Sequence, residues 1–221
     1  MRVAMLPARS GSKRLSKKNY LKFGGKTVLE LGIEKAIRSD AFDRIVINSD
    51  DSNLADVSNK WGVDFYLRPP ELATDFATSD QVVLDFLKKF APTSLYWINT
   101  ASPLSKTSDV ATVASKFEDS GSSATVTGNS KYVHAMHKGL PLNFSFTERE
   151  FARTQDIEPV FLLNYAVMGW KMSAAESLEC GTLFPSDTLF VETSEEASFL
   201  LKTSEDYGRL LALSCRPGNE V

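Results

Sequence analysis

The chain has 221 residues, of which 43% are hydrophobic and 24% charged, a composition typical of a soluble globular protein. This length is enough for one sizeable domain. There are 25 lysines and arginines against 28 acidic residues, a net charge of −3, so the chain lacks the broad positive surface of a nucleic-acid-binding protein. No apolar run approaches the ~20 residues that cross a bilayer, and no signal-peptide pattern opens the chain, so we expect no membrane association.

Two cysteines, Cys180 and Cys215, lie far apart and belong to no Cys-x-x-Cys pair. We expect both thiols to be buried and reduced. The predicted location is therefore the cytoplasm.

Short apolar runs alternate with helical patterns through most of the chain. The first strand, 3–6, leads into a loop and then into a helix at 27–39, which Thr27 and Glu30 open as a capping box. Further strands are predicted at 43–49, 64–67, 94–99, 123–127, 164–170 and 189–192, and further helices at 53–61, 78–90, 107–119, 173–180 and 204–213. This alternation predicts an α/β fold with an open, largely parallel sheet covered by helices on both faces. Ligands of such sheets bind beyond the carboxyl ends of the strands.

The alternation breaks over residues 129–160, where aromatic, charged and turn residues mix without a period. We interpret this stretch as an antiparallel excursion with a turn near His137, Lys138 and Gly139. The excursion cannot bury its apolar side chains alone, so we expect it to pack against a partner and predict a homodimer. These side chains are Tyr132, Val133, Leu140, Leu142, Phe144 and Phe146. The chain is then one domain, 1–221, with a dimerisation and substrate excursion.

A block of positive charge follows the first strand. Residues 9–26 carry seven basic side chains and no acidic one, in a chain that is slightly acidic as a whole. Gly11, flanked by Ser10 and Ser12, lets the backbone approach a ligand closely and turn N–H groups toward it, as phosphate-binding nests do. Arg9 can donate two parallel hydrogen bonds to phosphate oxygens, and Lys13 or Lys18 can act as a point charge. The block therefore indicates a site for a small polyanion, although a solvated basic loop would look the same.

The order of residues in this block is informative. Residues 6–19, Leu-Pro-Ala-Arg-Ser-Gly-Ser-Lys-Arg-Leu-x-x-Lys-Asn, closely resemble the N-terminal signature of the CMP-sugar synthetases. These are the cytidylyltransferases for acylneuraminate (sialic acid), pseudaminate, legionaminate and, more distantly, 3-deoxy-manno-octulosonate. The resemblance implies a three-layer Rossmann-like nucleotidyltransferase fold with a mostly parallel central sheet. It also implies transfer of CMP from CTP to a 2-keto-3-deoxy sugar acid, with release of pyrophosphate.

Three further stretches are similar to the same family. Residues 67–79 resemble a segment that lies over the nucleotide, with Arg68 and Ser79 at positions that contact it; without a ligand they would be a loop stiffened by prolines and a helix cap. Residues 98–104 resemble Gln-Pro-Thr-Ser-Pro-Leu, with Asn99 in place of the glutamine. Residues 153–156 and 164–169 resemble stretches that line the sugar pocket, and would otherwise be a polar turn before a core strand.

The chain departs from the family near its end. The family's run Asp-Ile-Asp-Thr-x-x-Asp, whose first two aspartates hold magnesium, aligns with residues 200–206, where Leu200 and Lys202 replace those aspartates. Magnesium prefers hard oxygen ligands, which neither side chain offers. Three explanations stay open: the ammonium of Lys202 partly replaces the ion's charge, Mg²⁺ is carried only by the nucleotide, or activity has been lost.

The resemblance implies the following roles. Arg9 and Lys18 act as catalytic residues on the triphosphate. The nucleotide is bound by Leu6, Pro7, Ala8, Arg9, Ser12, Arg14, Asn19, Arg68 and Ser79. The sugar is bound by Asn99, Ser102, Arg153, Gln155 and Asn164. Two other hypotheses remain, namely a nucleotide-binding paralogue without catalytic activity and a nucleotidyltransferase for a different sugar or base.

Overall fold

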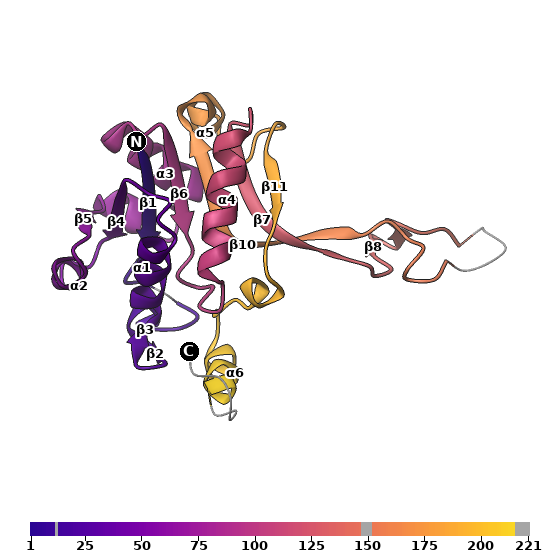
Figure 1. The fold of residues 1–221 in the computed structure, drawn as a ribbon, viewed down its shortest axis with the longest axis horizontal. Coiled ribbons are helices and arrows are strands. Elements are labelled where there is room, and N and C mark those ends of the chain that lie inside the picture. The colour runs from indigo at the N-terminus through magenta and orange to yellow at the C-terminus, as the bar shows by residue number, and fades with distance from the viewer. Residues whose placement is uncertain (12, 147–151, 215–221) are drawn as a thin grey trace.

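The computed structural model describes residues 1–11, 13–146 and 152–214. The main strands and helices follow the predicted alternation (Figure 1). The strands are β1 (Arg2–Pro7), β2 (Lys22–Phe23), β3 (Lys26–Thr27), β4 (Arg44–Ser49), β5 (Asp64–Leu67), β6 (Ser94–Ile98), β7 (Ala124–Lys131), β8 (Met136–His137), β9 (Leu140–Pro141), β10 (Val160–Lys171) and β11 (Leu189–Glu192). The helices are α1 (Val28–Arg38), α2 (Leu54–Trp61), α3 (Ser79–Phe90), α4 (Thr107–Asp119), α5 (Ala175–Glu179) and α6 (Ser204–Ser214), with short 3₁₀ turns at Lys18–Tyr20, Pro70–Ala73, Met172–Ala174 and Glu195–Ser198.

The centre of the fold is a seven-stranded sheet in the order β11-β7-β10-β6-β1-β4-β5. β1 pairs in parallel with both β4 and β6, and β5 pairs in parallel with β4. β10 runs antiparallel to both of its neighbours, β6 and β7, whereas β11 is parallel to β7. The strands other than β10 therefore end at the same edge, where we expect ligands to bind.

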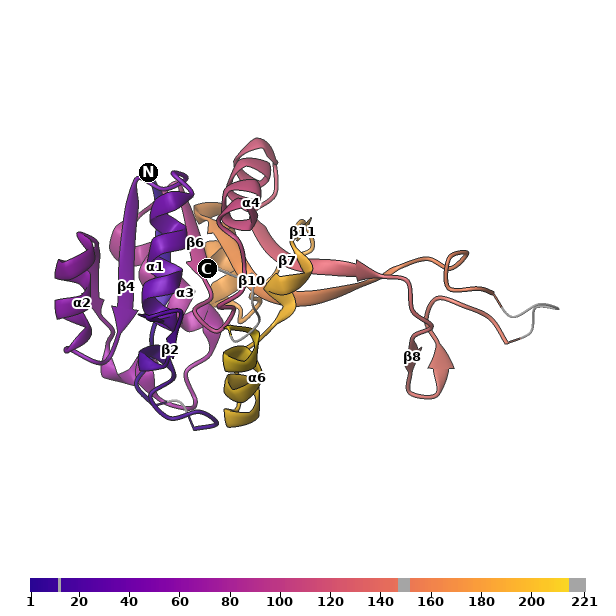
Figure 2. The same cartoon turned by 60° about the horizontal axis from the view of Figure 1, so that its bottom comes forward.

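Helices cover both faces of this sheet because alternate strand residues point to opposite sides. In β1, Ala4 and Leu6 pack in the cluster that contains α1, α2 and α4, while Val3 and Met5 pack in the cluster that contains α3 and α5. All four side chains are completely buried. Figure 1 shows α1 and α4 lying across the near face of the sheet. A third, smaller cluster joins Phe23 of β2 to Leu210 of α6. Figure 2 shows β2 and α6 lying below α1.

The N-terminus of α1 is fixed by a buried carboxylate. Glu30 accepts a hydrogen bond from the amide of Thr27, and the Thr27 hydroxyl accepts one from the amide of Glu30, which confirms the predicted capping box. The other carboxylate oxygen of Glu30 accepts from Lys60, at 2.6 Å, and from the indole of Trp61. Burial opposes ionisation of Glu30, but the hydrogen bonds from Lys60, Thr27 and Trp61 outweigh it and lower its pKa to about 2. One side chain thus caps α1 and attaches α2 to it.

β7 and β10 continue beyond the main sheet as an arm, which both views show extending well past the helices (Figures 1 and 2). The hairpin β8–β9 lies on this arm, and its two-residue turn, Lys138 and Gly139, has positive φ at both residues. This confirms the predicted turn. Large apolar side chains on the arm are exposed: Tyr132, Val133, Met136, Leu140, Leu142 and Phe146.

The fold class predicted from the sequence is confirmed. The domain limits, 1–221 with an excursion at 129–160, remain a prediction. The prediction that Cys180 is buried is wrong: Cys180 ends α5, which is shorter than expected, and its side chain is exposed. Cys215 lies outside the described residues. Within those residues no helix has both the length and the apolar character needed to span a membrane.

A glycine at the base of the arm should be intolerant of any side chain. A Cβ on Gly128 of β7 would lie 2.4 Å from Cε1 of Phe161 and 2.5 Å from the carbonyl oxygen of Leu162. We expect Gly128→Ala to lower the free energy of unfolding by about 1–3 kcal/mol, as overpacking does. Gly121→Ala is the matched control, because a Cβ there meets nothing within 4 Å. Urea denaturation of both variants checks this, and equal stabilities would contradict it.

The stabilising role of Glu30 should depend on pH. Its folded pKa of about 2 lies below the ordinary 4.5, so the contribution is complete above pH 4.5 and disappears as the pH falls toward 2. We expect Glu30→Gln to lose about 1–2 kcal/mol at neutral pH, in the range of lost helix caps. The deficit should shrink on acidification. Urea denaturation at a series of pH values measures this deficit. Asp56→Asn is the control, because Asp56 is exposed. A deficit that does not change with pH would refute the stabilising role of the Glu30 carboxylate.

Candidate functional site

A cavity of about 550 Å³ lies at the carboxyl edge of the sheet. The ends of β1 and β6, the basic loop after β1, the loop after β5 and the start of α3 all contribute to its walls. Among the residues that the structure describes, five basic side chains and one acidic side chain line it. The lining residues are Pro7, Arg9, Lys13, Arg14, Lys18, Asn19, Arg68, Leu72, Thr74, Asp75, Ala77, Thr78, Ser79, Val82, Trp97, Asn99 and Thr100. The excess of positive charge makes the cavity suited to an anion.

Side-chain hydrogen bonds hold the basic loop at this edge. The amide and hydroxyl of Ser10 donate to the two carboxylate oxygens of Asp50, at 2.8 and 2.5 Å, directly after β4. The side-chain Nδ2 of Asn19 donates to the carbonyl of Arg9, while its Oδ1 accepts from the hydroxyl of Thr100 after β6. The loop is therefore attached to the ends of both strands that flank β1.

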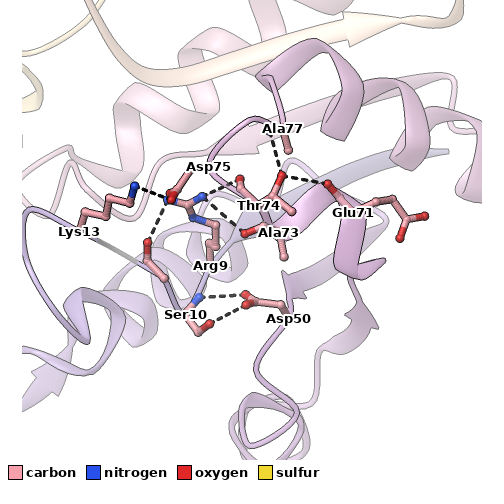
Figure 3. Close-up of polar contacts among 10 residues, drawn as sticks. Arg9, Ser10, Lys13, Asp50, Glu71, Ala73, Thr74, Asp75 and Ala77 are labelled. Carbon is pink, nitrogen blue, oxygen red and sulfur yellow. Dashed lines mark hydrogen bonds and ion pairs between the residues drawn. The ribbon is translucent and has the colours of Figure 1, made fainter.

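The guanidinium of Arg9 reaches across the cavity mouth to the loop after β5 (Figure 3). Its Nη1 donates to the carbonyl of Thr74 at 2.7 Å and, more weakly, to that of Ala73 at 3.5 Å. Its Nη2 donates to the carbonyl of Gly11 and lies 3.2 Å from a carboxylate oxygen of Asp75. Arg9 thus joins the basic loop to the loop after β5.

Asp75 is paired with two cations. Its second oxygen lies 2.6 Å from Nζ of Lys13 (Figure 3). The hydrogen bond from Lys13, aided by the charge of Arg9, keeps the pKa of Asp75 below its usual range. Asp75 is therefore a carboxylate, and it neutralises part of the positive charge at the cavity mouth.

Lys18 supplies a different kind of cation. It lies deeper, at the start of the 3₁₀ turn Lys18–Tyr20, and within the described residues no group accepts a hydrogen bond from its Nζ. Burial, together with the charges of Arg14 and Arg9, lowers the pKa of Lys18. An unpaired, partly desolvated ammonium among like charges gains strongly from an incoming anion.

Arg68 is the most buried cation of the cavity, with 6% of its surface exposed. Its Nε donates to the side-chain oxygen of Asn48 at 2.7 Å, and its Nη2 donates to the carbonyl of the same residue. Burial is the main cause that lowers the pKa of Arg68. Asn48 at the end of β4 therefore fixes the orientation of a guanidinium that lines the cavity.

Two further walls complete the cavity. Thr78 and Ser79 lie at the N-terminus of α3, where exposed amides and the helix dipole favour negative charge. Trp97 of β6 and Val82 of α3 form an apolar surface beside them. The cavity thus offers apolar surface as well as cations, as a nucleotide with a base and phosphates requires.

The turn after β6 is held from behind by α1. The ammonium of Lys35 donates to the carbonyls of Ser102 and Pro103, at 3.2 and 2.6 Å, and to the hydroxyl of Ser105. Burial lowers the pKa of Lys35 to about 8, against the opposing influence of Asp109 and Glu34. These contacts fix the segment that presents Asn99 and Thr100 to the cavity.

Most of the sequence-predicted nucleotide residues meet in this cavity. Pro7, Arg9, Arg14, Lys18, Asn19, Arg68 and Ser79 line it, as does the predicted sugar residue Asn99. Leu6 and Ala8 flank it but have buried side chains, and the backbone of Ala8 is already bonded to Asn48 and Ser49. Ser12 lies outside the described residues. The roles assigned to all these residues remain predictions.

The other predicted sugar residues do not line the cavity. Ser102 is buried and donates to the carbonyl of Ala197. Asn164 is buried in β10, where it donates to Asn129 and Thr193 and accepts from Thr127. Arg153 and Gln155 are exposed on the arm, and Arg153 pairs with Asp156 at 2.6 Å.

The magnesium site that the family resemblance implies does not fit these residues. Leu200 and Lys202 offer no side-chain oxygen, and neither lines the cavity. One oxygen of the nearby Asp206 carboxylate accepts hydrogen bonds from the amides of Lys202 and Thr203, and so caps the N-terminus of α6. In the parts of the chain described here, no group of three or more His, Cys, Asp or Glu residues could hold a metal ion.

Several lining residues were not identified from the sequence. Trp97 could have been found, because it lies two residues before Asn99 and side chains two apart on a strand point to the same face. Asp75 lies within a stretch that resembles the family, but its pairing with Lys13 joins residues far apart in the chain. The others are Leu72, Thr74, Ala77, Thr78, Val82 and Thr100.

Comparison with known proteins agrees with this geometry. The family model described as "Cytidylyltransferase" matches residues 3–143, which is more than half of the chain. The N-acylneuraminate cytidylyltransferase of Streptococcus agalactiae is 27% identical over 215 residues, covering 93% of this chain and 51% of that protein. The chain therefore spans about half the length of this relative. The pseudaminic acid cytidylyltransferase of Campylobacter jejuni is 39% identical over 82 residues, covering 37% of this chain and 35% of that protein.

A solved structure shows the same fold. The CMP:2-keto-3-deoxy-manno-octonic acid synthetase complexed with CTP superposes with a TM-score of 0.67 at 18% identity, covering 96% of this chain and 98% of that one. The family model and the relatives confirm the resemblance inferred from residues 6–19. The chain belongs to the cytidylyltransferase family.

Proposed function

We propose that this protein transfers CMP from CTP to a 2-keto-3-deoxy sugar acid of the sialic, pseudaminic or legionaminic type, releasing pyrophosphate. The observation that carries the proposal is the cavity itself. Five cations from two segments, the basic loop and the loop after β5, converge on it at the carboxyl edge of the sheet, in a chain of net charge −3 that belongs to the cytidylyltransferase family. The names of the relatives supply the class of acceptor.

The chemistry requires positioning and charge neutralisation. A hydroxyl of the sugar acid would attack the α-phosphorus in line, and pyrophosphate would leave. Negative charge would build up on the phosphate oxygens as the bond to pyrophosphate breaks. In our proposal Lys18 and Arg9 neutralise this charge, with support from Arg14 and the N-terminus of α3. Asn19, Arg68 and Ser79 would hold the nucleoside.

The protein residues do not fit a resident magnesium ion, so we assign no step to one. Lys202 is exposed and does not line the cavity, which argues against its ammonium as a substitute for the ion. Any Mg²⁺ would arrive with the triphosphate. We also propose that the protein is cytoplasmic, as expected from the sequence.

We further propose that the protein is a homodimer built through the arm. Leu140 and Leu142 are 70% and 61% exposed, and they lie on the same arm as the predicted sugar residues Arg153 and Gln155. A second copy would bury the apolar side chains. In such a dimer each arm would help to close its neighbour's cavity and bring these polar residues toward the sugar.

One observation favours a second candidate function. Without carboxylates at positions 200 and 202, the chain could bind the nucleotide and not transfer it. Pyrophosphate release from CTP with a panel of nine-carbon sugar acids, measured with Mg²⁺ and with EDTA, distinguishes the two functions. Binding of CTP without release in either condition would favour the non-catalytic protein.

Removing the charge of Lys18 should weaken catalysis far more than removing an outer charge of the same basic block. We expect Lys18→Ala to raise the activation free energy by about 2–4 kcal/mol, as loss of a transition-state donor does. This lowers kcat/KM roughly 30- to 1,000-fold. Arg9→Ala should act in the same direction. Lys22→Ala is the control, because Lys22 is exposed on β2 and does not line the cavity.

The measurement is pyrophosphate release, with CTP affinity determined by calorimetry. Equal losses in the Lys18 and Lys22 variants would show that only overall charge matters. CTP affinity unchanged when Arg9 and Lys18 are replaced together would refute the assignment of the triphosphate to this loop.

Charges placed on the arm should separate the proposed dimer. We expect Leu140→Asp combined with Leu142→Asp to convert a dimer to a monomer in light scattering, because burying two carboxylates is unfavourable. The unfolding temperature of the monomer should show that the main sheet remains folded. Ile37→Asp, on the exposed side of α1, should leave the dimer intact. A wild-type monomer at assay concentration would refute the proposal.

A further inference from the structure

The cation pair at the mouth of the cavity is already occupied by an anion of the chain itself. Arg9 and Lys13 both contact the carboxylate of Asp75, at 3.2 and 2.6 Å, one oxygen to each (Figure 3). Asp75 is the one acidic residue among the described residues that line the cavity. A carboxylate between two cations occupies the position that a phosphate group would take.

Arg9 cannot keep these contacts and also bind phosphate fully. Its Nη1 donates to the carbonyls of Ala73 and Thr74, and its Nη2 meets the carbonyl of Gly11 and Asp75. Four of the five N–H groups of a guanidinium are on its two terminal nitrogens. The contacts just given engage both of these nitrogens. A phosphate that approaches them must replace at least one partner, and Asp75 is the partner that a second anion would displace.

The loop that carries Asp75 is held close by its own turn. The Thr74 hydroxyl donates to the carbonyl of Glu71 and accepts from the amide of Ala77. After displacement, Asp75 therefore stays near Arg9 and Lys13 at a high effective concentration. A free anion must compete with this tethered carboxylate, which a singly charged anion does poorly and a polyphosphate does well.

We infer that Asp75 is a specificity-determining residue: an internal counter-anion that a phosphate chain displaces from Arg9 and Lys13, and that excludes small anions from this cation pair. The inference deepens the proposed function and rests on it. When the sugar hydroxyl has attacked and pyrophosphate is still bound, return of Asp75 to the two cations competes with the leaving group. Asp75 then promotes release of pyrophosphate as well as selecting for it.

The arrangement argues against Asp75 as a metal ligand. Both of its oxygens are bound to cationic groups, and the other lining residues of the described chain add no second carboxylate. A divalent ion placed there would be repelled by Arg9 and Lys13. Removing the charge of Asp75 should raise the affinity for pyrophosphate if Asp75 is a counter-anion, and should lower it in the presence of Mg²⁺ if Asp75 is a metal ligand.

The test is calorimetric binding of pyrophosphate, CTP and cytidine to the full chain, in the absence of metal and, in a second series, with Mg²⁺. Asp75→Asn keeps the shape of the side chain and removes its charge. We expect it to bind pyrophosphate and CTP about three- to tenfold more tightly than the wild type, the scale expected for two exposed ion pairs. Affinity for cytidine, which carries no phosphate, should be unchanged. Inhibition of pyrophosphate binding by chloride should increase.

Glu71→Gln is the matched control. It removes one negative charge from the same loop, but the Glu71 side chain pairs with neither Arg9 nor Lys13 and does not line the cavity. Its affinities should stay within about twofold of the wild type, as for a distant surface charge. Equal tightening in both variants would show a general charge effect and refute the role of Asp75.

Other outcomes also decide the matter. Unchanged or weaker pyrophosphate binding by Asp75→Asn would overturn the inference, and weakening seen only with Mg²⁺ would identify Asp75 as a metal ligand. If wild type and variant both fail to bind CTP and pyrophosphate, the proposed function fails with it. If the wild type binds CTP and the variant gains nothing, only the inference on Asp75 fails.

Discussion

The site depends on a few hydrogen bonds that hold a basic loop against the edge of a sheet. Seven positive side chains within residues 9–26 repel one another, and alone they would favour an extended, solvated loop. Ser10 attaches the loop to Asp50 after β4, and Asn19 joins the carbonyl of Arg9 to Thr100 after β6. These contacts concentrate the charge at one point, where the parallel strands end.

The cations so gathered are not equivalent. Arg68 is buried and oriented by Asn48, so it has a fixed geometry. Lys18 is partly desolvated and lies near Arg9 and Arg14, so it gains most from an arriving negative charge. Arg9 and Lys13 are partly neutralised by Asp75. A cavity can therefore combine strong attraction for a polyanion with a stable ligand-free state, because the mouth carries its own exchangeable counter-anion.

The two sides of the cavity differ in completeness. The side formed by β1, the basic loop and α3 is built from one chain and is closely connected. The residues predicted to hold the sugar, Arg153 and Gln155, lie on an arm that leaves the main sheet and exposes apolar side chains. Within the proposed function, one chain supplies the nucleotide side and the arm of a second copy would complete the acceptor side.

The sequence by itself determined the features that depend on near neighbours in the chain: the strand and helix order, the Thr27–Glu30 cap, the turn at Lys138 and Gly139, and the family resemblance of residues 6–19. Only the tertiary structure decided features that join distant segments, because no local pattern records a pairing across a fold. Asp75 with Lys13, Lys35 with the Ser102 carbonyl and the burial of Asn164 in β10 are of this kind. Cys180 is exposed for the same reason, since burial depends on what packs against a short helix and not on the residue's own polarity.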